Sequence, residues 1–335
     1  MTEGGIAGPG LGRVPTMTVD PIEEALALLR TGYVLPERAA RAVEEIRARR
    51  AAGAYDGLAD EALAERLTAD LFAICADRHL RVRLRDETLA AATTEADRAA
   101  ARHTQMRLDN YGIARVERLD GNVGYLDLRM IAEAGAGGRA IAAAMELVAH
   151  THALIVDLRR NRGGSPNGVI FWTSYFFPDD QTHLNSIHDR ESGTTRQYWS
   201  LAYLPGERYL DRPVFVLTSG TTFSGGEEFC YNLQAQGRAT LVGETTRGGA
   251  HPTRVVPITP TLEITVPYAR SVNPVTGTNW EGTGVEPDVP VPADQAYDVA
   301  YRRALEHVLA TTTAPGIRAE ARAALDRLGG PTHPA

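Results

Sequence analysis

The feature that most constrains the fold is a repeated unit in which a short apolar strand leads into a glycine-rich turn and then a helix. Ala153–Asp157 and Pro213–Leu217 are apolar runs of strand length, and each is followed by such a turn. Strands are also expected at 113–116, 123–128, 241–243 and 262–266, and helices at 140–148 and 296–309. This alternation predicts an α/β fold with a central sheet covered by helices.

The residues before this region predict a separate helical unit. Asp20 is a good N-cap for a helix with Pro21 at its first position, and further helices are expected after Pro36 and from near Asp60. His79–Leu84 alternates as a strand does. We therefore expect a flexible tail at 1–19, an N-terminal helical domain and connector at 20–104, an α/β domain at 105–312, and a C-terminal helix and tail at 313–335.

Composition excludes several kinds of chemistry. All 35 basic side chains are arginine, so no Schiff-base lysine, P-loop lysine or Ser–Lys dyad can form. The net charge of −7 argues against a nucleic-acid partner. Cys75 and Cys230 are too few for a disulfide framework. No zinc-site spacing and no dinucleotide-binding glycine motif is present, so we expect neither a metal nor a cofactor. Without a leader or a membrane-length apolar run, we expect a cytoplasmic protein with no membrane partner.

Two loops at the carboxyl ends of predicted strands are the candidate site. They span 157–166 and 218–229, and the second places Ser224 where a loop enters a helix. Free backbone N–H groups at such a junction suit a nucleophile that forms an oxyanion, although Ser224 can equally serve only as the helix N-cap. Thr222 breaks the G-x-S-x-G pattern, which weakens an α/β-hydrolase interpretation. Glu227 and Glu228 are expected to be structural, since negative charge is favoured in a first helical turn.

Six segments, in order, resemble the tail-specific (C-terminal-processing) serine peptidases, in particular the branch with the tricorn protease core and the interphotoreceptor retinoid-binding protein modules. The segments are 122–126, 157–164, 218–229, 238–244, 248–252 and 281–288. Residues 20–75 resemble the N-terminal domain of the retinoid-binding-like branch. The resemblance implies a crotonase-like (Clp-protease-like) β/α spiral core with a small N-terminal helical bundle and, for lack of room between 85 and 120, no PDZ domain.

The resemblance also implies roles for individual residues. The family's nucleophile falls on Ser224, and the lysine of its Ser–Lys members falls on Gly249. Arg247 cannot replace that lysine, because a guanidinium stays protonated in proteins. A histidine is then the candidate base. The histidine of tricorn-like members matches His79 and their glutamate matches Glu281, an orienting carboxylate.

Other parts of the implied site stay open. Arg78 stands where the tricorn-like members have a serine. His251, in a loop near the family's site, is the rival base or a substrate-binding residue. The backbone N–H groups of Gly163, Gly164 and Gly225 would form the oxyanion hole, although the glycines of the first pair can also serve only a tight turn.

These observations predict a serine hydrolase, most simply a peptidase that forms an acyl-enzyme on Ser224 with a peptide or small acyl substrate. One alternative is a non-catalytic or repurposed module that binds an apolar ligand, like a retinoid-binding protein. Another is a biosynthetic enzyme acting on an acyl or carbonyl substrate. The aromatic group at 171–177 is expected in the core, in an apolar pocket, or on the face of a homo-oligomer.

Overall fold

In the computed structural model, which describes residues 20–85 and 94–329, the N-terminal unit is a bundle of three helices. They are α1 (Pro21–Gly32), α2 (Pro36–Ala51) and α3 (Asp60–Cys75). The predicted starts of all three are confirmed, and the Asp20 side chain caps α1 by accepting from the backbone N–H groups of Ile22 and Glu23. The expected tail at 1–19 and residues 86–93 of the connector lie outside the described residues.

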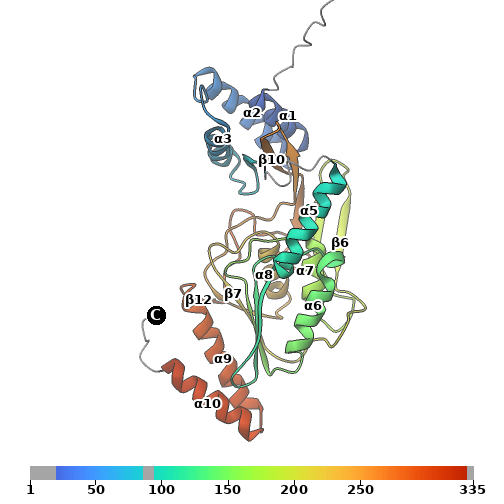
Figure 1. The fold of residues 1–335 in the computed structure, drawn as a ribbon, viewed down its shortest axis with the longest axis vertical. Coiled ribbons are helices and arrows are strands. Elements are labelled where there is room, and N and C mark those ends of the chain that lie inside the picture. The colour runs from blue at the N-terminus through green and yellow to red at the C-terminus, as the bar shows by residue number, and fades with distance from the viewer. Residues whose placement is uncertain (1–19, 86–93, 330–335) are drawn as a thin grey trace, which may run out of the picture.

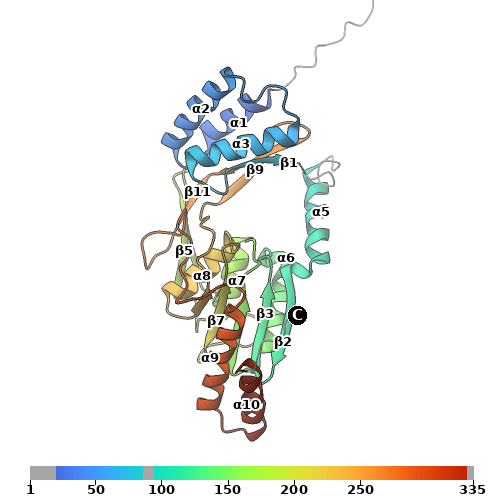
Figure 2. The same cartoon turned by 90° about the vertical axis from the view of Figure 1, so that its left-hand side faces the viewer.

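A small antiparallel sheet packs against these helices and comes from two distant parts of the chain (Figure 2). Its order is β1 (Arg81–Leu84), β10 (Leu262–Pro267) and β9 (Thr253–Pro257). The strand expected at 262–266 therefore forms, but outside the central sheet. The reason is its apolar face: Leu262, Ile264 and Val266 are buried in one core with the bundle.

The central sheet has the strand order β12-β8-β7-β4-β3-β2. Its members are β2 (Ile113–Leu119), β3 (Val123–Leu128), β4 (Ala153–Asp157), β7 (Val214–Thr218), β8 (Thr240–Gly243) and β12 (Val289–Pro290). β2 and β3 form the predicted antiparallel hairpin, and the remaining pairs are parallel. A parallel sheet of this kind places its loops at one edge, beyond the carboxyl ends of the strands.

Helices cover both faces of this sheet, as its apolar strands require. One face carries α6 (Ala134–Val148), α7 (Pro166–Ser174) and α8 (Gly225–Ala235), and the other carries α9 (Ala296–Thr311) and α10 (Pro315–Gly329). Alternate residues of β4 enter the two cores: Leu154 and Val156 face the first set, and Ile155 faces the second. The mixed α/β core with a helical N-terminal unit confirms the expected fold class.

A third sheet and a connecting helix join the two parts (Figures 1 and 2). The sheet has the order β11 (Ala269–Val272), β5 (His183–Asp189) and β6 (Thr195–Trp199), and the connection runs through α5 (Glu95–Leu108) and the short helix η1 (Asn110–Gly112). Trp172, Tyr175, Phe176 and Phe177 of the aromatic group are buried in the core. Both cysteines are buried and free. Among the described residues, no helix is long and apolar enough to cross a membrane.

Candidate active site

Ser224 lies at the N-cap of α8, on the turn that follows β7. Its backbone adopts φ 54° and ψ −121°, a region that non-glycine residues rarely occupy. The turn is held by the carboxylate of Glu227, which accepts the Ser224 N–H at 2.8 Å. Such a strained strand-to-helix turn presents a side chain at the edge of the sheet, and backbone strain of this kind concentrates at functional sites.

The loop after β4 brings two glycines against this turn. Asn161 fixes the loop, because its side chain donates to the Leu128 carbonyl and accepts from the Gly163 N–H, both at 2.8 Å. A Cβ added to Gly163, where φ is 100°, would lie 2.7 Å from the Cβ of Ser224. The position therefore needs glycine for close approach to Ser224, beyond the turn that it makes.

Two backbone amides next to Ser224 are available to an oxyanion. A Cβ placed on Gly225 would lie 3.0 Å from the Gly164 nitrogen, so the two residues are in contact. Within the described residues, neither the Gly164 N–H nor the Gly225 N–H donates a hydrogen bond. Gly225 is also the first residue of α8, where the helix dipole favours negative charge. The structure thus brings Ser224 together with the predicted oxyanion-hole glycines.

His79 lies in the turn between α3 and β1, with its ring against Phe223, the neighbour of Ser224. The ring centroids are 4.4 Å apart. The turn is fixed by Asp77, whose Oδ1 accepts the His79 N–H at 2.9 Å. The Nδ1 atom of His79 is buried and has no hydrogen-bond partner in the described part of the chain. Burial, which disfavours the charged imidazolium, lowers the pKa of His79 to about 4.

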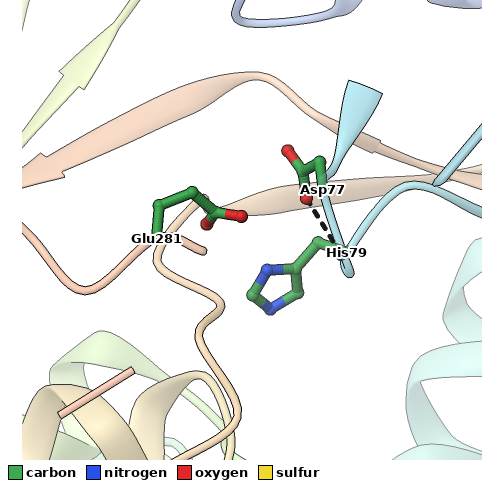
Figure 3. Close-up of side chains that lie close together, drawn as sticks. All are labelled: Asp77, His79 and Glu281. Carbon is green, nitrogen blue, oxygen red and sulfur yellow. Dashed lines mark hydrogen bonds between the residues drawn. The ribbon is translucent and has the colours of Figure 1, made fainter. Parts of the chain in front are cut away.

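Glu281 comes from a distant part of the sequence and lies close to Asp77 and His79 (Figure 3). One oxygen, Oε2, accepts the Ala250 N–H at 2.6 Å, and the other, Oε1, is buried without a partner within residues 20–85 and 94–329. Burial raises the pKa of Glu281 to about 7, and the nearby charge of Asp77 acts in the same direction. Glu281 and His79 therefore each present an unpaired buried atom in one small region of the site.

His251 does not stand alone, because it is paired with Asp77. Its Nδ1 lies 2.8 Å from Asp77 Oδ2 and 3.5 Å from Glu281 Oε2. Burial alone would lower the pKa of His251, but the hydrogen bond to Asp77 and the charge of Glu281 raise it. Burial likewise opposes ionisation of Asp77, yet the bond from His251 keeps its pKa below the usual range. The surroundings of the two histidines therefore shift their pKa values in opposite directions, downward for His79 and upward for His251.

Asp77 is a site residue that the sequence reasoning missed. Besides His79 and His251 it accepts a hydrogen bond from the Tyr33 hydroxyl at 3.1 Å. It thereby joins the bundle to the core at the site. Its only sequence signal was its position two residues before His79, a spacing typical of an Asx turn.

Asp77, His79 and Glu281 are also the candidate group for a metal ion. Each offers one ligand atom, and these atoms lie within 4.8 Å of one another. Three hydrogen bonds already occupy the Asp77 carboxylate, from Tyr33, His79 and His251. Of the three residues, His79 and Glu281 each have a buried atom that is unpaired among the residues described by the structure.

Glu227 joins the nucleophile turn to the loop at 246–249. In addition to the Ser224 N–H, its fully buried carboxylate accepts hydrogen bonds from the Thr246 hydroxyl and from the N–H groups of Gly248 and Gly249, at 2.6 to 2.9 Å. The expected structural role of Glu227 is thus the positioning of this loop. A Cβ added to Gly249 would lie 2.8 Å from Cε1 of His79 and 2.3 Å from the Phe223 ring. The rings of His79 and Phe223 therefore fill the space into which a side chain at 249 would project.

One cleft of about 820 Å³ is lined by Ser224, both candidate histidines, Gly164 and Gly225. Its walls come from the bundle side and from the core. No hydrogen bond joins Ser224 to either imidazole among the described residues, and such contacts are often loose until substrate binds. The cleft is thus lined by a serine, two amide donors and two histidines, and the carboxylates of Asp77 and Glu281 contact one of these histidines, His251.

Two family profiles match the sequence of this chain. The sequence profile of peptidase family S41 matches residues 122–291, and that of the N-terminal domain of peptidase S41 in eukaryotic IRBP matches residues 16–114. The fold is similar to a protein of Parabacteroides merdae assigned as a peptidase, with a TM-score of 0.55, 16% identity and coverage of 92% of this chain and 96% of that one.

Two further solved structures also match this chain. Mature CPAF matches with a TM-score of 0.54, 12% identity and coverage of 88% and 99%. The photosystem II D1 C-terminal processing protease matches with a TM-score of 0.42 and 23% identity over 51% of this chain, which spans 43% of that protein. The match to the S41 profile covers half of the sequence and contains Ser224 and Glu281, and the chain therefore belongs to peptidase family S41.

Proposed function

We propose that the chain is a serine peptidase in which Ser224 is acylated by a peptide substrate and His79 is the general base. In the acylation step, His79 takes the hydroxyl proton as the Ser224 oxygen bonds to the carbonyl carbon, and it returns that proton to the leaving amine. The amides of Gly164 and Gly225 are placed to stabilise the tetrahedral oxyanion. Water then cleaves the acyl-enzyme by the same steps.

The observation that carries this proposal is the position of His79 in the space next to Gly249. The Ser–Lys form of such a site needs a lysine side chain there, and the sequence has none. His79 packs where that side chain would begin, and this supports an imidazole in place of the amine as the base. Glu281 would act as the orienting carboxylate and stabilise the imidazolium that forms in the transition state.

A fluorophosphonate probe tests the proposal directly. Such probes react with serines activated as nucleophiles, so the native protein should be labelled stoichiometrically. Digestion followed by mass spectrometry should place the adduct on Ser224. Heat-denatured protein is the control, since unfolding separates the serine from its base. Labelling of the native protein no greater than that of the denatured control would contradict the proposal.

The pH dependence of peptide cleavage should reflect the ionisation of Glu281. With a pKa of about 4, His79 is already neutral at neutral pH, whereas Glu281, with a pKa of about 7, is only partly ionised. Because the ionised carboxylate stabilises the imidazolium, kcat/KM should rise as the pH increases through about 7.

Glu281→Gln should remove this dependence. The variant should have a lower rate that is nearly constant between about pH 5 and 8, because the remaining base stays neutral over that range. An unchanged rise in the variant would instead assign the dependence to His251, whose pKa is raised.

The alternative of an apolar-ligand module has less support from the site. Four arginines line the cleft, and burying an apolar ligand beside them would remove water from cationic groups without replacing it. A peptide, with polar backbone groups and charged ends, is better matched to such walls.

A further inference from the structure

The charge of the cleft is opposite to that of the whole chain. The sequence has a net charge of −7, yet the cleft is lined by four guanidinium groups, those of Arg81, Arg83, Arg162 and Arg247. Glu228 is the only acidic side chain among the described lining residues, and burial raises its pKa to about 7, so that it is partly neutral at physiological pH. A cationic cleft in an acidic protein concentrates anions at the site.

Two of these arginines lie against one aromatic ring, that of the residue before Ser224. The guanidinium carbons of Arg81 and Arg247 lie 5.4 Å and 5.2 Å from the centre of the Phe223 ring. Phe223 precedes Ser224 directly, and the same ring contacts His79. The two cations therefore lie against the same ring as His79, and that ring belongs to the residue directly before Ser224.

Neither arginine has an acidic partner among the residues that the structure describes, whereas Arg83 on the same strand is paired with Glu263 at 2.7 Å. The Nη2 atom of Arg81 is buried and makes no hydrogen bond to any residue that the structure describes. Two like charges held close together repel each other, and a buried donor without a partner adds to the cost in free energy. An anion bound between the two groups would offset both costs. Interaction with the Phe223 ring only partly offsets this cost.

We propose that Arg81 and Arg247 form a carboxylate-binding subsite of the cleft, so that the peptides cleaved carry a carboxylate close to the scissile bond. This inference rests on the proposed peptidase function and adds the substrate class to it. The planar guanidinium group binds a carboxylate through two parallel hydrogen bonds, and the pair of arginines offers two such forks. The carboxylate can be an acidic side chain or the C-terminus of the peptide.

The subsite also has a consequence for assembly of the active site. Arg81 comes from β1 of the bundle unit, and Arg247 comes from the loop that Glu227 fixes in the core. A carboxylate bound by both would hold the two units together at the cleft that His79, from the bundle side, and Ser224 both line. Substrates without the carboxylate should therefore bind more weakly and react more slowly.

Peptide binding to the full chain carrying Ser224→Ala measures this subsite without turnover. The probes are fluorescein-labelled eight-residue peptide pools in four forms, with a free or amidated C-terminus and with Glu or Gln fixed at one internal position. Fluorescence anisotropy at low and moderate salt gives the affinities. We expect one carboxylate form to bind about tenfold more tightly than its neutral counterpart, with the preference weakening as salt is raised.

The preference should fall to less than about twofold when Arg247→Gln is added, and likewise with Arg81→Gln. Arg247 is exposed, so its variant keeps the test valid if the Arg81 variant folds poorly. Arg139→Gln, on the exposed face of α6, removes the same charge elsewhere and should keep the preference. A preference for the free C-terminus identifies an end-binding subsite, and one for Glu over Gln identifies an acidic side chain.

Equal binding of all four pools, or a preference that survives both arginine variants, would overturn the inference. Failure of the proposed function looks different. In that case the wild type is not labelled by fluorophosphonate, although the preference for carboxylate peptides remains. Labelling of Ser224 without any carboxylate preference, conversely, supports the peptidase and rejects the subsite.

Discussion

Replacing Ser224 by alanine should lower peptide turnover by about four orders of magnitude or more, with little change in the affinity for peptide. The hydroxyl oxygen is the only atom lost, and without it no acyl-enzyme can form. The amides of Gly164 and Gly225 remain in place, so part of the stabilisation of the oxyanion persists. The measurement is kcat on a fluorogenic peptide together with KM or a direct binding constant.

A matched control separates this effect from a change in folding. Ser192→Ala removes the same hydroxyl from an exposed turn and should leave turnover unchanged. Thermal unfolding of both variants should follow the wild type closely, because alanine keeps the Cβ that packs against Gly163. Turnover of Ser224→Ala within tenfold of the wild type would exclude acylation of this residue.

Replacing His79 by alanine should have the second largest effect, a loss of about three to four orders of magnitude in kcat. The variant removes the base and leaves a space beside Phe223 that a small molecule can enter. Added imidazole should therefore restore part of the activity, in proportion to its neutral form. This rescue is a result that loss of structure alone would not produce.

The comparison with His251 decides between the two histidines. His251→Asn keeps a donor for the Asp77 carboxylate but has no titratable ring, so it should retain activity within about tenfold of the wild type. The opposite pattern, with His79→Ala active and His251→Asn inactive, would make the His251–Asp77 pair the catalytic one. The raised pKa of His251 would then place the acid limb of the rate profile above 6.5.

Features encoded by neighbouring residues could be predicted from the sequence. The starts of α1, α2 and α3 follow from Asp20–Pro21, Pro36 and Asp60, and the buried strands β4 and β7 follow from their apolar runs. The strands β5, β6 and β11 were not predicted. Their polar and partly exposed residues carry no clear period, and they form through pairing with one another.

The site shows the same division between local and distant information. The oxyanion-hole roles of Gly163, Gly164 and Gly225 rested on the family resemblance. The turn at Ser224 itself could be predicted, because a strand, a glycine-rich loop and a helix mark it locally. Asp77 could not, since its partners Tyr33 and His251 lie 44 and 174 positions away in the sequence. Nor does the sequence indicate that Phe223 brings two arginines and His79 to one ring. These contacts depend on how the units meet.

The hairpin of β9 and β10 shows that the S41 segment does not bury its own apolar surface without the N-terminal helices. The hairpin is encoded within the S41 segment, yet its apolar side chains are buried against the N-terminal helices. A chain with only the S41 segment would expose the apolar side chains of this hairpin and would lack His79. Recombination is therefore expected to keep the S41 segment and the N-terminal helices together as one unit.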